Sequence, residues 1–361
     1  MPDPSSISHL FNDLIVLDLS SVLAGPQVGS FFSELGAKVI KIENKKSNGD
    51  PTRQWKLEQE KGSDRISSYY ASGNYDKKSI FMDLNDAADH NALMDLVGNA
   101  DIVISNYQPR VAKKFKVDYD SLIFYNMELI YAQLYAYAED DPRPGYDLVM
   151  QAETGFMSMN GQPDGAPAKM PVAMIDLMAA HQLKEAILIA LLKRERNAAG
   201  SLIEVSLYQS AIASLANQAS NYLMADHIPK KLGSLHPNIA PYGDAYTSKD
   251  DVSFILAVGS DDQFNKLGKT LRSEKLLSST FDSNNIRLQN RAEMNEALQA
   301  EFCKRAYSEI EQLLRSQSIP FCRVLSLDRV FTEKLAKDMI LNHVIEGDAV
   351  KSVSQIAFTI S

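Results

Sequence analysis

Asp176 is the acidic residue least expected in its surroundings, the stretch AKMPVAMIDLMAAHQLKEAIL (168–188). It stands where an apolar approach containing a proline passes into a long apolar segment that predicts a helix. One interpretation is structural, because aspartate is among the best N-cap residues and accepts hydrogen bonds from the first helical turn. The other is chemical, because a carboxylate at a helix start can attack an electrophile while nearby amides stabilise the oxyanion. The pattern alone leaves both interpretations open.

Three pairs of adjacent lysines are a second candidate for chemistry. They are Lys45–Lys46, Lys77–Lys78 and Lys113–Lys114, each near the start or end of a predicted strand in the N-terminal half. Such pairs ordinarily belong to a solvated surface. Placed together around one sheet, they would frame a site for phosphate groups.

The loop SSVLAGPQVGS (20–30) invites comparison with a dinucleotide-binding turn. It lacks the GxGxxG pattern, because Gly25 and Gly29 are four residues apart and Pro26 removes one amide donor. Glu43, at the end of the next predicted strand, is placed where a ribose-binding acid would sit. Without the glycine pattern, a nicotinamide cofactor is disfavoured.

The elements that must position these residues follow a regular alternation. Apolar runs at 14–19, 37–43, 79–84, 101–107, 128–138 and 201–207 predict strands, and helical patterns separate most of them. This alternation predicts an α/β fold with right-handed crossovers and a mainly parallel sheet. Ligands in such sheets bind beyond the carboxyl ends of the strands. A helix is expected from Asp176 to about residue 196, and after residue 225 the pattern becomes that of a separate α+β lobe.

The composition excludes several classes of function. A net charge of −9 and a pI near 5.3 argue against nonspecific nucleic-acid binding. The first 14 residues have neither the basic start nor the apolar run of a signal peptide, and no stretch reaches the roughly 20 apolar residues of a membrane helix. The two cysteines, Cys303 and Cys322, lie 19 positions apart and no histidines cluster, so neither a disulfide framework nor a metal site is expected. We expect a cytoplasmic globular protein.

Eight segments together resemble the family III CoA-transferases, which include formyl-CoA transferase and carnitine CoA-transferase. No single segment is decisive, but their order and spacing follow that family from about residue 13 to about residue 358. The segments are VLDLSSVLAGPQVGSFFSELGAKVIKIEN, GDPTR, NYDKKSIFMDLN, ADIVISNYQPRVAKKFKVDYDSL, RPGYDLVMQAETGFMSMNG, IDLMAAHQLKEAILIALLKRER, GSLIEVSLYQSAI and HPNIAPYG.

The resemblance implies a fold and a reaction. The expected fold is α/β, with a Rossmann-like large CoA-binding domain (1–224), a smaller α+β domain (225–318) and a segment returning to the large domain (319–361). Two such ring-like chains would interlock as a homodimer. The expected activity moves coenzyme A between an acyl-CoA donor and a carboxylic-acid acceptor. The family's nucleophilic aspartate falls on Asp176, and no metal is implied.

The family's coenzyme A site maps onto several segments of this chain. Lys114 matches a cation that the family places near a CoA phosphate, and Lys45 stands beside a position that is basic in some members. The full set is Val22, Leu23, Ala24, Asn44, Lys45, Met82, Asp83, Leu84, Asn85, Asn106, Tyr107, Gln108, Lys114, Arg143, Pro144, Gly145 and Tyr146.

Departures from the family pattern keep two alternatives open. Formyl-CoA transferase has glutamine at the position of Leu23, and its glycine-rich lid has no counterpart near HPNIAPYG, which argues against formyl/oxalate exchange. The related α-methylacyl-CoA racemases carry histidine in a GHD triplet, where this chain has Tyr146 in GYD. A phenol is a poor base at neutral pH, so transfer is favoured over racemisation. Leu23, together with a chain end ahead of the usual family tail, leaves open a catalytically silent CoA-binding protein.

Overall fold

The computed structural model describes residues 9–60 and 65–360. Residues 1–8, which make up most of the stretch judged unlike a signal peptide, lie outside that range. Within the described part, no helix has both the length and the apolar character needed to cross a membrane. The chain forms two compact units: one holds the described residues up to 157, residues 169–228 and those from 335 on, and the other holds 158–168 and 229–334.

A six-stranded, fully parallel sheet is the centre of the first unit, in agreement with the predicted α/β class. Its strand order, β3-β2-β1-β4-β5-β6, is that of the doubly wound dinucleotide-binding fold. The register places Leu17 of β1 beside Ile40 of β2 and Val103 of β4. The strands are β1 (Ile15–Asp18), β2 (Lys38–Asn44), β3 (Lys77–Met82), β4 (Ile102–Ser105), β5 (Ile130–Tyr135) and β6 (Ser201–Ser206).

Two apolar cores cover the two faces of this sheet. Val16 belongs to the core beneath α1, α8 and α9, whereas its neighbour Leu17 belongs to the core beneath α3, α4 and α5. Alternation of side chains along a strand produces this separation, and both residues are fully buried. The helices of this unit before the return segment are α1 (Ala24–Glu34), α2 (Ser68–Asn74), α3 (Ala87–Val97), α4 (Pro109–Phe115), α5 (Tyr119–Leu122), α6 (Asp147–Glu153), α8 (Met174–Asn197), α9 (Leu207–Ala213) and α10 (Ala216–Ala225), and α7 (Phe156–Met159) straddles the boundary.

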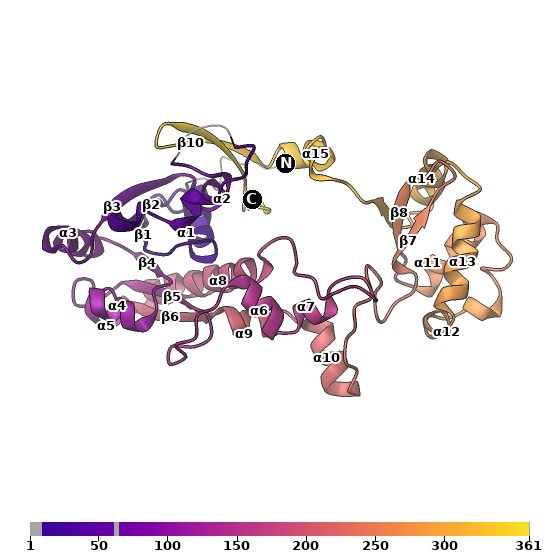
Figure 1. Cartoon of the computed structure of the whole chain (residues 1–361), viewed down its shortest axis with the longest axis horizontal. Helices are drawn as coiled ribbons and strands as arrows, with labels where there is room; N and C mark the ends of the chain where they lie inside the picture. Colours follow the sequence, from indigo (N-terminus) through magenta and orange to yellow (C-terminus); the bar gives the residue numbers. More distant parts are fainter. Residues whose placement is uncertain (1–8, 61–64, 361) are drawn as a thin grey trace. The chain divides into compact units, whose positions relative to one another are not determined.

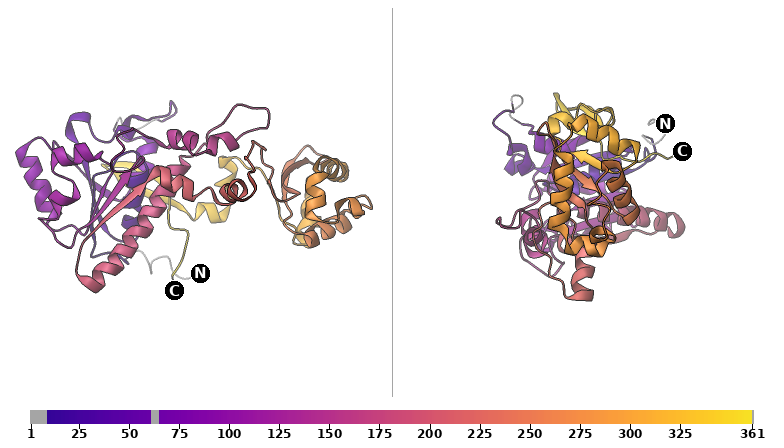
Figure 2. Two further views of the ribbon diagram at one scale, coloured as in Figure 1. Left: turned by 90° about the horizontal axis from the view of Figure 1, so that it is seen from below. Right: turned by 90° about the vertical axis from the view of Figure 1, so that its right-hand side faces the viewer.

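The long helix α8 packs along β5, β6 and α1 (Figure 2). It begins at Met174, two residues before the predicted start, and has Ala173 as its N-cap. Gly36 follows α1 with φ of 101°, a left-handed conformation that glycine adopts without penalty. Gly25 is required for a different reason, because a Cβ there would lie 2.2 Å from the Ser20 hydroxyl oxygen.

The second unit has its own antiparallel sheet and apolar core. The strands β7 (Tyr242–Thr247), β8 (Ser253–Ala257) and β9 (Phe321–Arg323) pair in that order. The chain therefore leaves this unit later than the predicted position 319, because β9 pairs with β8. The helices are α11 (Asp261–Leu271), α12 (Asn284–Gln289), α13 (Arg291–Phe302), α14 (Tyr307–Ser316) and α15 (Leu327–Val330), and α16 (Lys334–Lys337) spans the return to the first unit.

The return segment forms a hairpin, β10 (Ile340–Ile345) and β11 (Asp348–Val353), beside α2 (Figure 1). Ile345 packs against Tyr70 and Tyr75 in a small apolar cluster. At the hairpin turn, Glu346 reaches Arg53 across 293 positions of sequence. The return hairpin is thus held to the N-terminal part of the first unit by both an ion pair and apolar packing.

Candidate active site

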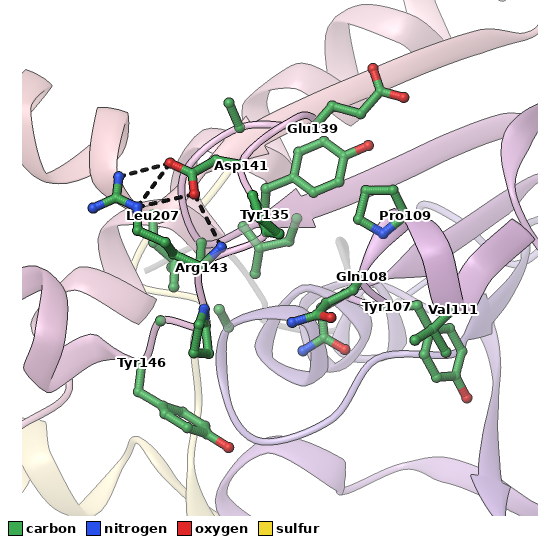
Figure 3. Close-up of a pocket in the computed structure, with 18 of the residues that line it drawn as sticks. Tyr107, Gln108, Pro109, Val111, Tyr135, Glu139, Asp141, Arg143, Tyr146 and Leu207 are labelled. Atoms are coloured by element: carbon green, nitrogen blue, oxygen red, sulfur yellow. Dashed lines mark hydrogen bonds and ion pairs between the residues drawn. The ribbon is translucent and has the colours of Figure 1, made fainter.

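The sheet has its topological switch point between β1 and β4, because the chain runs outward from β1 in one direction and from β4 in the other. Open α/β sheets bind ligands at this point, beyond the carboxyl ends of the strands. A cavity of about 760 Å³ lies there, a volume typical of ligand sites. The loop after β1, the segment after β4, the segment after β5, Asp176 and Leu207 line it, all within the first unit. Figure 3 shows Tyr107, Gln108 and Pro109 on one side of this space and Asp141, Arg143 and Tyr146 on another.

Asp176 lines this cavity from the first turn of α8, and only 8% of its surface is exposed. It is the third helical residue rather than the N-cap, so the capping interpretation of Asp176 is wrong. Another carboxylate has that role. Asp147 Oδ1 accepts hydrogen bonds from the amides of Ile175 (2.8 Å) and Asp176 (3.4 Å). Among the described residues, none donates a hydrogen bond to the Asp176 carboxylate, which leaves it available to a ligand.

Asp147 is held in place from its own helix. It begins α6 as the last residue of the GYD triplet, and its Oδ2 accepts a hydrogen bond of 2.6 Å from Gln151 Nε2. Gln151 Oε1 in turn accepts from the amide of Met170, 2.7 Å away. The chain before α8 and the start of α8 are therefore both tied to α6, which fixes the direction of the Asp176 side chain.

Burial, and next the negative charge of Asp147, raise the pKa of Asp176 from 3.8 to about 7. A buried carboxylate beside another carboxylate is costly to ionise, since both desolvation and like charge disfavour the anion. Strongly raised pKa values in a cavity are typical of functional groups. The anion of Asp176 is correspondingly more basic than an ordinary carboxylate and is shielded from water.

The loop between β1 and α1 is held by side chains rather than by secondary structure. The Asn106 side chain accepts from the Ser21 amide (3.1 Å) and donates to the Ser21 carbonyl (2.9 Å). Asn106 was predicted to contact coenzyme A, but both atoms of its side-chain amide are hydrogen-bonded to the backbone of Ser21. Within the described part of the chain, no acceptor pairs with the amides of Leu23 and Ala24, which line the cavity beside Asp176.

The structure brings together most, but not all, of the residues predicted for the site. Asn44 lies in a neighbouring hollow of about 190 Å³ that shares Ser21 and Tyr107 with the main cavity. Lys45, Lys114 and the segment 82–85 line neither space. Those that line the main cavity are Val22, Leu23, Ala24, Asn106, Tyr107, Gln108, Arg143, Pro144, Gly145, Tyr146 and Asp176.

The idea that three lysine pairs frame one anion site does not hold. Lys77 is buried and its ammonium donates to Asp18 Oδ2 at 2.8 Å and to the Pro26 carbonyl at 2.7 Å, so it is unavailable to a ligand. Lys46 pairs with Asp83 at 2.8 Å. Lys114 lies over the ring of Phe115, which in turn contacts the ring of Tyr107 at the cavity wall. Lys114 is thus one side chain removed from the cavity.

Sequence reasoning missed the role of Asp147, which does not line the cavity but caps α8, and it missed several residues that do line it. Asp147 was part of the GYD triplet, but its bond to α8 depends on how two helices pack. Arg110 lines the cavity two residues after Gln108, and a cation in this position was detectable from the sequence. Glu139 and Asp141 also line it, and Asp141 forms a two-oxygen ion pair with Arg143 (2.7 to 3.1 Å).

Arg143 is therefore not a free cation. Its guanidinium lies 3.7 Å from the centre of the Tyr137 ring and pairs with Asp141, which raises the pKa of Arg143 and lowers that of Asp141. Exposed ion pairs of this kind contribute little to stability. The pair instead orients the turn that carries Tyr146 at the cavity rim. In the described residues, no group of His, Cys, Asp and Glu side chains is arranged to hold a metal ion.

Comparison with known proteins adds independent findings. The sequence profile of CoA-transferase family III matches residues 11–360. The succinate–glutarate CoA-transferase of Agrobacterium fabrum is 34% identical, over 88% of this chain and 80% of that protein. The succinyl-CoA:glutarate CoA-transferase of Mus musculus is 32% identical, over 88% of this chain and 72% of that protein. The crystal structure of a CAIB/BAIF family protein from Brucella suis superposes with a TM-score of 0.80 at 33% identity, covering 96% of this chain and 92% of that one.

Proposed function

The chain belongs to family III of the CoA-transferases and is an enzyme of that class, and from this premise we propose that it moves coenzyme A from an acyl-CoA to a carboxylic acid through covalent intermediates on Asp176. The observation that carries this proposal is the Asp176 carboxylate itself. It lines the switch-point cavity, accepts no hydrogen bond from the described residues and has a pKa raised to about 7. Such a carboxylate is a desolvated nucleophile at neutral pH.

The proposed reaction has four steps. The Asp176 carboxylate attacks the thioester carbonyl of the donor, the C–S bond breaks, and a mixed anhydride and CoA thiolate result. The thiolate attacks the aspartyl carbonyl, which releases the donor acid and leaves an aspartyl-CoA thioester. The acceptor carboxylate then displaces the thiolate to form a second anhydride. Attack of the thiolate on the acceptor's acyl carbon yields the new acyl-CoA and restores Asp176.

Each step passes through a tetrahedral oxyanion, which needs hydrogen-bond donors in place. We assign this role to the unpaired backbone amides of Leu23 and Ala24, at the start of α1. A backbone amide is unaffected by the side chain that carries it. The leucine at position 23 is therefore compatible with catalysis, and it does not favour a silent CoA-binding protein.

The carboxylic acids exchanged are proposed to be short dicarboxylic acids. Relatives at 34% and 32% identity are named for succinate and glutarate. In the described part of the chain the cations at the cavity wall are Arg110 and Arg143, and Arg143 is already paired with Asp141. Arg110, which no described acidic group pairs with, is the cation left for an anionic group of a substrate.

A racemase on the same fold is less consistent with the cavity. Racemisation by proton exchange on both faces of the α-carbon needs a second acid/base group besides Asp176, whose pKa of about 7 would suit one of the two. None of the described residues lining the cavity is a histidine. Burial raises the pKa of both Tyr107 and Tyr135, which makes their phenols still weaker candidates for a base at neutral pH. Group transfer by Asp176 uses the residue that the cavity does supply.

The enzyme is further proposed to act as a homodimer. Helix α10 buries none of its residues within the chain. It exposes an apolar run of Tyr222, Leu223 and Met224, the last with 87% of its surface accessible, and Ile228 follows just beyond. Several exposed apolar side chains within one short segment are typical of a contact with another chain. A second copy of this chain is the partner proposed to cover α10, because the family resemblance implies two interlocked ring-like chains.

Trapping of the covalent intermediate tests the proposed function. Incubation with succinyl-CoA alone is expected to place CoA on Asp176, and hydroxylamine should convert that thioester into a hydroxamate on the peptide 170–184. Peptide mass spectrometry reads out both species. Asp176→Ala should show neither, and the matched variant Asp147→Asn should retain them. An adduct on another residue, or glutarate-dependent transfer by Asp176→Ala, would overturn the assignment.

The pH dependence of transfer gives a second test. Asp176 must be ionised to attack, so kcat/KM for the acyl-CoA is expected to fall as the pH drops through about 7. Asp147→Asn removes the neighbouring negative charge but keeps an oxygen that accepts from the Ile175 amide. Its acid limb should move to lower pH. Glu139→Gln, which changes another cavity carboxylate, should leave the midpoint in place, and a midpoint unmoved by Asp147→Asn would contradict the electrostatic explanation.

A further inference from the structure

Val22 has a backbone conformation that is unusual for its residue type. Its φ is +73°, in the left-handed region, and it is a β-branched residue outside any regular element. Branching at Cβ makes this conformation costly, so the surrounding structure must hold it in place. Strain of this kind persists where a function depends on it. Val22 lines the cavity immediately before Leu23 and Ala24.

A buried carboxylate accounts for the conformation of Val22. Asp50 of the GDPTR motif accepts a hydrogen bond from the Val22 amide, with Oδ2 at 3.2 Å and Oδ1 at 3.4 Å. The same carboxylate accepts from the Thr52 amide (3.0 Å) and the Thr52 hydroxyl (2.7 Å), which fix its orientation. The backbone of Val22 is thus tied to a turn 28 residues away in sequence.

A buried lysine completes the arrangement. The ammonium of Lys41 on β2 lies 3.1 Å from Asp50 Oδ2 and donates to the Ser20 carbonyl at 2.8 Å. It is also 3.9 Å from Asp18, whose Oδ1 accepts from the Ser20 amide at 3.0 Å. The side chains of Asp18, Lys41 and Asp50 are all almost wholly inaccessible to solvent. A buried charge group of this kind is retained only when its members satisfy one another.

We propose that Asp50 is a positioning residue for the coenzyme A loop: by holding Val22 in the left-handed conformation, it aims the unpaired amides of Leu23 and Ala24 into the cavity. The inference rests on the proposed function, because it assumes that these amides meet the acyl-CoA. It assigns to the GDPTR motif a role in substrate binding without contact with the substrate. Asp50 lines the neighbouring hollow and not the main cavity.

A double-mutant cycle between Asp50 and Val22 tests this assignment, with free coenzyme A as the probe in calorimetric titrations of the whole protein. Asp50→Asn is expected to weaken CoA binding about tenfold, because the left-handed conformation loses its support. Val22→Gly adopts that conformation without penalty. In the double variant Asp50→Asn/Val22→Gly, we therefore expect most of the lost affinity to return. KM for acyl-CoA should follow the same pattern, with kcat changing less.

Controls separate this role from a general loss of folding. Asp86→Asn makes the same chemical change at an exposed N-cap, that of α3, and should bind CoA like the unmodified protein. If Asp50→Asn fails to fold, Thr52→Val removes only the hydroxyl that orients Asp50 and should weaken binding two- to threefold, again reversed by Val22→Gly. Wild-type affinity in Asp50→Asn, or no recovery in the double variant, would overturn the inference. Failure of the unmodified protein to bind CoA would instead overturn the proposed function.

Discussion

Replacing Asp176 by asparagine is expected to abolish CoA transfer and at the same time to stabilise the protein at pH 8. Removing the group that forms the covalent bond should lower kcat by about 10⁴-fold or more. The stability effect has a separate cause. Burial and the neighbouring Asp147 hold the pKa of Asp176 at about 7, so at pH 8 the folded protein carries a carboxylate that would be better solvated in the unfolded chain.

The sign of the stability effect follows from proton linkage. Because the folded pKa lies above the ordinary value of 3.8, the folded protein binds more protons than the unfolded chain between about pH 4 and pH 7. The free energy of unfolding therefore falls as the pH rises through that window. Asparagine removes the penalty, and at pH 8 we expect a gain of about 4 kcal/mol that disappears near pH 4.

Urea unfolding of both proteins at pH 4, 6 and 8 measures this effect. Transfer assays on the same samples, made from freshly prepared protein, exclude regeneration of aspartate by deamidation. Asp141→Asn is the matched control, because Asp141 also lines the cavity but lies at its exposed rim, paired with Arg143. It should give no pH-dependent gain. Equal stability of Asp176→Asn and the unmodified protein at all three pH values would show that Asp176 is not a strained carboxylate.

Local pattern was sufficient to predict the sheet and the place of the site. Apolar runs of six to eleven residues marked the strands, and alternation with helical segments required parallel crossovers. The six-stranded parallel sheet agrees with that prediction. The family resemblance, rather than the pattern, assigned the segments 22–24 and 106–108 to one coenzyme A site, and both segments line the cavity.

What could not be predicted depends on contacts between distant segments. Asp147 caps α8 across 28 positions, and Asn106 holds Ser21 across 85. No local pattern specifies which aspartate satisfies a helix start, because that depends on the packing of α6 against α8. The start of α8 two residues before Asp176 was missed for the same reason: Ala173 is a poor cap by itself, and the helix begins there because Asp147 accepts from its first turn.

Arg53 is the clearest case of a residue whose contribution to stability cannot be predicted from the sequence. It reads as an ordinary arginine in GDPTR, yet only 3% of its side chain is exposed. Its guanidinium binds both oxygens of Glu43, with N–O distances of 2.5 and 2.8 Å. It also donates to the Tyr70 hydroxyl at 2.7 Å and to Glu346 of the return hairpin at 2.8 Å. One side chain thus joins β2, α2 and the β10–β11 hairpin.

Arg53→Met is therefore expected to lower the free energy of unfolding by about 3–5 kcal/mol at neutral pH, the usual cost of leaving a buried charge unpaired. Burial by itself would raise the pKa of Glu43, but Arg53 lowers it to about 2. Ionised Glu43 therefore stabilises the folded protein at pH values above 4.5, its ordinary pKa. This stabilisation is lost as the pH falls from 4.5 through about 2, the pKa in the folded protein. Without Arg53 the dependence should reverse, since an unpaired Glu43 is tolerated better when protonated.

The variant should accordingly be most destabilised at pH 7 to 8 and should recover part of the loss near pH 5, as measured by urea unfolding. Glu43→Gln in the Arg53→Met background removes the stranded charge, so the double variant should lose clearly less stability than the sum of the two single changes. Arg315→Met is the matched control, because Arg315 pairs with Glu311 at 2.8 Å but is 70% exposed. Exposed pairs contribute at most about 1 kcal/mol. If the losses in the free energy of unfolding from the two single changes were additive, the two side chains would stabilise the fold independently. That result would contradict a stabilising bidentate contact between Glu43 and Arg53.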